Sequence, residues 1–400
     1  MSNARQFVPY GRQQITESDI EAVVTVLRSD FLTTGPVTDA FEIAFANFVD
    51  APFAAVCANG TAALHLCALA LQLGPSDAVI VPTITFLATA SAPHLTGAEV
   101  YFADVEPDTG LTTPAHVLAA AKRAEADGKT VRAVFPVHLN GQCVDIVALR
   151  AALAPEIAII EDACHALGGR YANGSNVGSC GASTASIFSF HPVKSLTTGE
   201  GGMVTTRDPR FDAAVRLQRN HGMVRTAEEF IDQTAAFEEG DVNPWYYEMQ
   251  APGFNYRATD LACALGLSQL TRLDETMAHR TALFAHYEKC LEALGPDIRL
   301  VTRSTGSKPG WHLCVVLIDF DRVGQSRAEL MRALRVRGIG TQVHYIPVHR
   351  QPYYKNRYGL LDLPGAQSYY QRCLSLPLHT TMSSQDVEMI VKALHECLNN

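Results

Sequence analysis

The stretch Ser186–Gly202, SIFSFHPVKSLTTGEGG, places one lysine, Lys194, between an apolar run and a turn rich in glycine. The run SIFSF has the composition of a strand, and Pro192 ends that strand just before the lysine. A surface position is the usual interpretation of a single lysine. Here the flanking residues are apolar, and burial among them lowers the pKa of an amine and makes its nucleophilic form available. The stretch therefore predicts a strand that ends beside a reactive lysine.

Short β-branched runs alternate with helical stretches from about residue 53 to residue 205: FAAVCA, AVIVP, VYFADV, VRAVFPV, IAIIEDA and ASIFSF. This alternation predicts an α/β protein with a mainly parallel sheet covered by helices. After residue 265 come a long helical segment, a loop at LGPDIRLVTRSTGSKPG, a strand at WHLCVVLIDF, a helix, a strand at TQVHYIP and two more helical segments. We expect a large domain over 1–270 that includes an N-terminal arm, and a smaller α/β domain over 271–400. Residues 226–250 are interpreted as an excursion or lid.

Composition excludes several classes of function. The net charge is -9 with no block of Lys or Arg, which argues against a nucleic-acid or membrane-surface partner. There is no apolar leader and no stretch long enough to cross a bilayer, so a cytoplasmic location is expected. The ten cysteines form no Cys-x-x-Cys pair and are interpreted as buried thiols.

Two other apolar runs end in residues suited to a ligand site, because ligands of open α/β sheets bind at the carboxyl ends of the strands. Asn59-Gly60-Thr61 opens a helix whose free N–H groups and positive dipole end suit a phosphate; the alternative is an ordinary turn with a helix cap. Asp162 ends the run IAIIED, where a buried carboxylate needs a cation or a hydrogen-bond donor. The alternative for Asp162 is also a helix cap.

A phosphate turn, a buried aspartate and a desolvated lysine together match the needs of pyridoxal 5′-phosphate (PLP). The lysine holds the aldehyde as a Schiff base, the carboxylate keeps the pyridine nitrogen protonated, and the helix end holds the phosphate. The combination is much more specific than any one of its parts.

The chain resembles the DegT/StrS-type nucleotide-sugar aminotransferases, which are PLP-dependent transferases of fold type I. The motifs that carry the resemblance occur in the family's order over nearly the whole chain: NGTAALHL, TFLATA, EDACHALGG, FSFHPVKSLTTGEGG, RNHGM, GFNYRATDLACALGLSQL and VHYIPVH. The resemblance implies a large domain with a seven-stranded sheet, a smaller C-terminal domain, and a homodimer with shared active sites.

By this resemblance Lys194 and Asp162 are the catalytic residues, with Lys194 bound to the cofactor and Asp162 facing the pyridine nitrogen. Phe86 corresponds to the aromatic residue stacked on the cofactor ring, and His165 lies near the ring. Asn255 resembles an asparagine that reaches the phosphate across the dimer interface. The remaining cofactor contacts implied are Gly60, Thr61 and Ser189.

Within the family, SFHPVKSLTTGEGG and VHYIPVHRQPYY most resemble the members that aminate C4 of a UDP-4-keto-6-deoxy-N-acetylhexosamine in pseudaminic acid synthesis. An amino acid donor, L-glutamate by resemblance, would supply the amino group. Asp30 and Phe31 depart from the residues expected in those members, and the segment before GFNYR is longer. The implied substrate contacts are Tyr10, Asp30, Phe31, Leu32, Thr33, Ser189, His191, Asn255, His344, Tyr345, Ile346 and Pro347.

Two alternatives remain at this point, namely another keto sugar as substrate and a regulatory protein of the same fold; Lys194 argues against a dehydratase, and the dinucleotide-binding interpretation is discarded. The substrate could be a 3-keto sugar or a dTDP- or GDP-linked sugar. A sugar dehydratase of the same fold would carry histidine in place of Lys194, and a regulatory protein of this fold is a rival from another class. The glycines of GSNVGSCG do not open a helix after a strand, as a dinucleotide-binding turn would. His344 and His349 lack further ligands at metal-site spacing, so no metal is expected.

Overall fold

The computed structural model describes residues 7–398. Its largest sheet has seven strands in the order β1-β7-β6-β5-β4-β2-β3. All neighbouring strands are parallel except for the β7 pairs, because β7 is antiparallel to both β1 and β6. The α/β class and the six predicted strands are confirmed. The bounds are β1 Phe53–Cys57, β2 Asp77–Pro82, β3 Glu99–Ala103, β4 Thr130–Val134, β5 Ala158–Asp162, β6 Ala185–Ser189 and β7 Gly202–Thr206.

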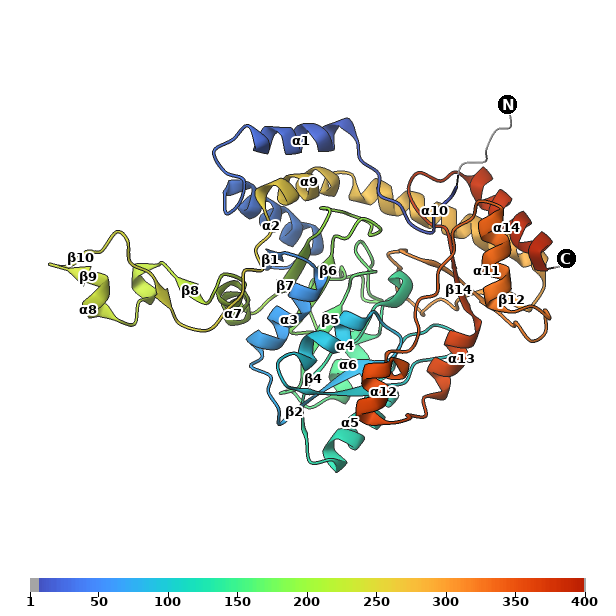
Figure 1. Cartoon of the computed structure of the whole chain (residues 1–400), viewed down its shortest axis with the longest axis horizontal. Coiled ribbons are helices and arrows are strands. Elements are labelled where there is room, and N and C mark those ends of the chain that lie inside the picture. The colour runs from blue at the N-terminus through green and yellow to red at the C-terminus, as the bar shows by residue number, and fades with distance from the viewer. Residues whose placement is uncertain (1–6, 399–400) are drawn as a thin grey trace.

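Helices cover both faces of this sheet, because alternate strand residues point to opposite faces. Phe188 and Met203 pack with Phe45 of α2 on one face, whereas Ile187 and Val204 join the apolar core that holds α3 and α5. The structure is thus three layered around the sheet (Figure 1). The helices are α1 Glu17–Leu27, α2 Pro36–Val49, α3 Gly60–Ala70, α4 Leu87–His94, α5 Pro114–Ala126, α6 Ile146–Ala152, α7 Pro209–Arg219 and α9 Asp260–Leu270.

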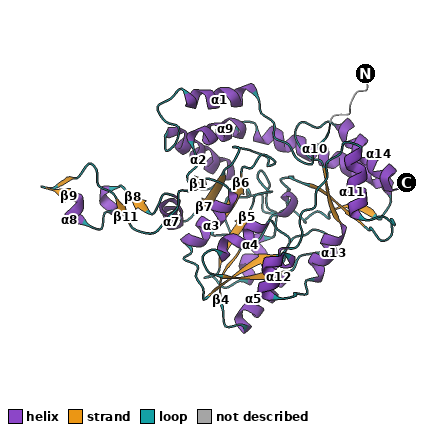
Figure 2. Cartoon of the chain, in the orientation of Figure 1, coloured by secondary structure: helices purple, strands orange, loops and turns teal. Residues whose placement is uncertain are grey.

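A second, three-stranded antiparallel sheet, β12-β13-β14, lies in the C-terminal part of the chain. Helices α10, α11 and α14 bury their apolar residues with it, and this part lies at one end of the molecule in Figures 1 and 2. The division at residue 270 stays a prediction. The bounds are α10 Leu273–Leu291, β12 Ile298–Leu300, β13 Cys314–Ile318, α11 Arg327–Val336, α12 Pro352–Tyr358, α13 Pro364–Arg372, β14 Cys373–Leu376 and α14 Ser384–Leu398.

Several details of the C-terminal part differ from the sequence-based expectation. β12 lies inside the segment expected to be a loop, and three helices rather than two follow residue 347. Residues 341–347 are not a strand: their one bridge joins Gln342 to Ser375, and the chain then turns so that 344–346 line a cavity. The pattern of TQVHYIP does not distinguish a strand from an extended segment that lines a ligand site, and residues 342–346 are such a segment.

Residues 223–249 form an arm that projects from the body of the molecule (Figure 1). The arm contains β8 Met223–Val224, α8 Gln233–Ala236, β9 Phe237–Glu238, β10 Asp241–Val242 and β11 Glu248–Met249. Val224, Phe230 and Ala236 form a small apolar cluster within it. The two ends of the arm meet, since Gln250 N donates to Gly222 O at 2.8 Å. The excursion expected over 226–250 is therefore this arm.

Long-range capping fixes the start of α2. The Asp260 carboxylate, fully buried, accepts from Gly35 N at 2.9 Å, Val37 N at 3.1 Å and Thr38 Oγ1 at 2.7 Å. These donors belong to the N-terminal end of α2, where backbone N–H groups lack partners inside the helix. Asp260 therefore joins α9 to α2 through charge-assisted hydrogen bonds.

We predict that Asp260→Ala lowers the free energy of unfolding by about 2–3 kcal/mol, because it leaves buried donors unpaired. Urea unfolding of the cofactor-free protein, followed by circular dichroism, measures the change. The matched control is Asp274→Ala, which removes an exposed carboxylate from the first turn of α10. A loss no larger than that of the control would contradict the capping role.

Candidate active site

A cavity of about 630 Å³ opens where the strands of the large sheet end. Asp162 is the last residue of β5 and Ser189 the last residue of β6, and these two strands pair in parallel. Their carboxyl ends therefore deliver both side chains to the same edge, as expected for a ligand site of an open α/β sheet. Lys194 follows in the turn after β6 and lines the same cavity.

The N-terminus of α3 faces this cavity. Asn59 Oδ1 caps the helix by accepting from Ala62 N at 2.8 Å, and Gly60 and Thr61 line the cavity beside Ser189. A Cβ atom on Gly60 would lie 2.9 Å from Ser189 Cβ, so the backbone approach requires glycine. The first-turn N–H groups and the dipole of this eleven-residue helix suit a phosphate.

Gly202 explains part of the glycine-rich turn after Lys194. A Cβ atom at this position would collide with the Asn59 carbonyl group, because β7 begins directly against the start of α3. Glycine is therefore required where β7 and the turn at Asn59 meet.

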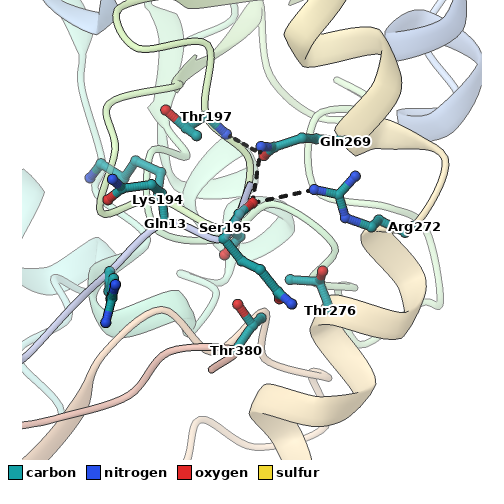
Figure 3. A pocket seen from close by; sticks show the side chains of 10 residues that line it. Gln13, Lys194, Ser195, Thr197, Gln269, Arg272, Thr276 and Thr380 are labelled. Atoms are coloured by element: carbon teal, nitrogen blue, oxygen red, sulfur yellow. Dashed lines mark hydrogen bonds between the residues drawn. The ribbon is translucent and has the colours of Figure 1, made fainter. Parts of the chain in front are cut away.

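Hydrogen bonds to neighbouring elements hold the loop that carries Lys194 in place. Thr197 N donates to Gln269 Oε1 at 3.0 Å, and Gln269 and Arg272 contact the carbonyl oxygen of Gln14. Figure 3 shows Thr197, Gln269 and Arg272 around a small polar pocket next to Lys194. α9, α10 and the N-terminal segment thus hold the lysine loop in place.

Burial lowers the pKa of Lys194 below the ordinary lysine value, while the neighbouring Cys164 and Asp162 act in the opposite direction. The reason is that a low-dielectric surrounding disfavours the charged ammonium form. A larger fraction of this amine is therefore neutral, and nucleophilic, than of an exposed lysine at the same pH. The desolvation expected from its apolar neighbours is thus found in the structure.

Three neutral histidines surround the lysine. Burial lowers the pKa of His165 and of His312 well below the usual value, and that of His344 to about 3. His165 Nε2 lies 3.1 Å from the Tyr345 hydroxyl oxygen, and its ring is 4.5 Å from that of His312. His165 Nδ1 is buried without a partner among the described residues, so it is available to a polar group of a ligand in the cavity.

The residues present fit PLP. The cavity offers a helix N-terminus for the phosphate, a buried carboxylate for the pyridine nitrogen, a desolvated lysine for the aldehyde and an unpaired histidine nitrogen. Phe86 lines the same cavity and is 56 % exposed. An aromatic residue that stacks on a bound ring has such an exposed face when the ring is absent. In the described part of the chain, no group of three or more His, Cys, Asp or Glu side chains is placed to hold a metal ion.

Most of the predicted site residues come together around this cavity, and six do not. Asp30 to Thr33 lie on the surface near the start of α9, where Leu32 O accepts from Asp260 N. Asn255 is exposed and bridges to Asn220, and Pro347 also lies outside the lining. The predicted residues that line the cavity are Tyr10, Gly60, Thr61, Phe86, Asp162, His165, Ser189, His191, Lys194, His344, Tyr345 and Ile346.

Sequence analysis missed several lining residues. His312 follows a glycine-rich loop and precedes β13, and only its place before a strand could have indicated a role. Thr85 is the first residue of the TFLATA motif, in which only Phe86 was given a role, and Gln342 was assigned to a strand. The missed lining residues are Leu64, Thr85, Leu87, Ala88, Val137, Cys164, Val193, Glu200, His312, Gln342, Val343 and Gln351.

This fold and this arrangement of lysine, aspartate and helix end define a PLP-dependent transferase of fold type I. Residues 13–395 match the DegT/DnrJ/EryC1/StrS aminotransferase family. The spore coat polysaccharide biosynthesis protein SpsC of Bacillus subtilis (strain 168) is 36 % identical over 394 residues, which covers 98 % of this chain and 97 % of SpsC.

Solved structures of similar proteins agree with this family match. PseC of Helicobacter pylori, an aminotransferase involved in the biosynthesis of pseudoaminic acid, has a TM-score of 0.86 at 26 % identity and covers 98 % of this chain and 100 % of its own. The PLP form of Spr1654 from Streptococcus pneumoniae has a TM-score of 0.85 at 26 % identity and covers 98 % of this chain and 99 % of its own.

The chain therefore belongs to the DegT/DnrJ/EryC1/StrS aminotransferase family. It is a sugar aminotransferase that uses PLP. The rival interpretation as a regulatory protein is thereby replaced. None of the helices in the range 7–398 combines the length and the apolar character that crossing a bilayer requires.

We predict that the amine of Lys194 becomes reactive at a lower pH than an exposed lysine, because its pKa is lowered. The cofactor-free protein is methylated briefly with formaldehyde and cyanoborohydride over a pH series, and mass spectrometry follows Lys194 and, as internal reference, the exposed Lys392. The neutral amine is the reactive form, so the pH midpoint for Lys194 should lie below that for Lys392. Asp162→Asn should move the Lys194 midpoint lower still, since Asp162 raises the pKa. A Lys194 midpoint at or above the reference would contradict the desolvated amine.

Proposed function

We propose that this aminotransferase moves an amino group from L-glutamate to C4 of a UDP-4-keto-6-deoxy-N-acetylhexosamine of the pseudaminic acid type. The likeness to PseC over the whole length of both chains carries the proposal. The lining of the cavity supports it, because Tyr10, Phe86, His344 and Tyr345 offer aromatic surface. Such surface suits the apolar face and the methyl group of a 6-deoxy sugar.

The residues of the chain would divide the chemistry as follows. When bound, PLP supplies a ring that withdraws the electron pair of the C–H bond being broken. Asp162 would hold a proton on the ring nitrogen, and the α3 N-terminus would hold the phosphate. The Lys194 amine, with its lowered pKa, would carry a proton from the α-carbon of the donor and, in the second half of the reaction, to C4 of the sugar.

A second candidate is amination of a different keto sugar. SpsC is more similar in sequence to this chain than PseC is, at 36 % against 26 % identity, and its name places SpsC in spore coat polysaccharide biosynthesis. Asp30 and Phe31, which differ from the residues expected in the C4-aminating members, also lie outside the cavity of this chain. A 3-keto sugar and a dTDP- or GDP-linked sugar are therefore kept as competing substrates in the test.

We predict that the PLP-loaded protein with L-glutamate aminates the L-arabino UDP-4-keto sugar faster than its D-xylo epimer or a 3-keto sugar. Release of 2-oxoglutarate measures the rate, and NMR of the product places the amino group. Lys194→Ala, which lacks the amine, should lose turnover by orders of magnitude. Preference for a 3-keto sugar would refute C4 amination, while turnover of only a dTDP- or GDP-linked sugar would refute the nucleotide.

We also propose that the enzyme is a homodimer in which Asn255 of each chain contacts the cofactor phosphate of the other. Asn255 is exposed and outside the cavity of its own chain. Trp245 and Met249 on the arm are each 71 % exposed, and exposed apolar groups of this size favour a partner surface. Lys194 is the only Lys or Arg among the described residues that line the cavity, although a nucleotide sugar carries a diphosphate.

We predict that mixing Lys194→Ala chains with Asn255→Ala chains restores cofactor affinity at one site of the mixed dimer. The site with an intact lysine then receives Asn255 from its partner. Removal of such a charge-assisted hydrogen bond costs about 1.5–3 kcal/mol, and fluorescence titration with PLP after subunit exchange measures its return. Exchange without any gain over the Asn255→Ala homodimer would show that the contact is not made in trans.

A further inference from the structure

We infer that two threonine hydroxyl groups, those of Thr85 and Thr89, form a hydrogen-bonded relay that positions the Asp162 carboxylate for its contact with the ring nitrogen of PLP. Both are positioning residues, since they act through Asp162. The inference goes beyond the proposed function, because it applies whichever keto sugar the enzyme accepts.

The relay is defined by two short contacts. Thr89 Oγ1 lies 2.6 Å from Asp162 Oδ2, and Thr85 Oγ1 lies 2.8 Å from Thr89 Oγ1. Both threonines are buried, with Thr89 fully so and Thr85 at 1 % exposure. Thr85 also lines the cavity, so the relay runs from the cavity wall to the carboxylate.

The chemistry of the groups fixes the direction of each hydrogen bond. An ionised carboxylate only accepts, so the Thr89 hydroxyl donates its single proton to Asp162. The Thr89 oxygen can then only accept from Thr85, which makes Thr85 the donor of the second bond. Hydrogen bonds that follow one another in this way polarise and strengthen each other in a low-dielectric interior.

Asp162 depends on this relay because few other groups hold its side chain. Cys164 N donates to Oδ1 at 3.2 Å; Thr89 is the partner of Oδ2. The terminal torsion of an aspartate is broad, so with one donor removed the carboxylate can rotate away from the ring nitrogen. The backbone of Asp162 is held separately, by Pro136 O and His138 N, and would not move with the relay.

A helix cap is the competing explanation for a threonine in the first turn of a helix, and it does not apply here. Thr89 is the third residue of α4, whose N-cap is Phe86 and has no side-chain cap. The hydroxyl group of Thr89 instead donates to Asp162, which lies far away in the sequence. Burying two hydroxyl groups costs free energy unless both are paired, and the relay pairs them.

The test compares Thr89→Val, which has nearly the same shape but no hydroxyl, with Thr89→Ser and Thr85→Val. Each protein is loaded with PLP labelled with ¹⁵N in the ring, and NMR reports the protonation of the ring nitrogen. Thr112→Val is the matched control, because Thr112 is also buried and its hydroxyl bonds Asp104 O away from the cavity. Circular dichroism and melting curves check the fold of each variant.

We predict a smaller protonated fraction in Thr89→Val, a dissociation constant for PLP raised about tenfold by the loss of one hydrogen bond to a charged group, and a lower kcat with an unchanged KM for the sugar. Thr89→Ser should restore the parent signal, Thr85→Val should fall between, and Thr112→Val should match the parent.

A parent-like ¹⁵N signal in a folded Thr89→Val protein would overturn the inference. If Thr89→Val does not fold, Thr85→Val decides, and a parent-like signal there would overturn the relay. A Thr89→Ser protein as altered as Thr89→Val would show that shape, and not the hydroxyl, matters.

Discussion

The parallel pairing of β5 and β6 fixes two carboxylates and a serine at one edge of the sheet, and one of those carboxylates points away from the cavity. Glu161, the residue before Asp162, is buried and accepts hydrogen bonds from His138 Nε2 at 2.7 Å, Ser186 Oγ at 2.9 Å, and the hydroxyl groups of Tyr171 and Ser183. These donors hold the pKa of Glu161 below its usual value against the effect of burial. These hydrogen bonds hold the end of β5 on the side away from the cavity. The backbone that carries Asp162 is therefore fixed, and the Asp162 side chain faces the cavity.

His138 connects the end of β5 to the loop that follows β4 through both ring nitrogens. Its Nδ1 accepts from Val144 N at 3.0 Å, which leaves the proton on Nε2 for Glu161. Burial lowers the pKa values of His165, His312 and His344, which gives the core of the enzyme a set of uncharged imidazoles. A lysine that must be neutral for part of a reaction cycle needs neighbours that neither donate protons to it nor pair with it as anions. Around Lys194, only Asp162 and Cys164 raise the pKa of the amine.

The sequence predicted the parts of this structure in which local chemistry and strand position agree. Lys194, Asp162 and the Gly60 turn each follow an apolar run, and the parallel-sheet geometry alone places them together. β7 was missed because GMVTT begins with glycine and gains its strand character from two antiparallel neighbours. His312 and the relay threonines were missed because their roles depend on contacts between segments far apart in the sequence. Asp30 to Thr33 and Asn255 lie outside the cavity of their own chain, so a site that includes them needs a second chain.

The closed base of the arm has an evolutionary consequence. Gly222 and Gly253 pack so tightly against the opposite side of that base that neither position has room for a Cβ atom, so the two ends stay together whatever lies between them. For a loop with fixed ends, each doubling of length costs only about 0.6 kcal/mol. The arm can therefore gain, lose or exchange residues while the rest of the enzyme stays unchanged. A residue inserted into or deleted from the arm would leave the junction at Gly222 and Gly253 in place, even where it changes the exposed side chains that the arm offers to a partner.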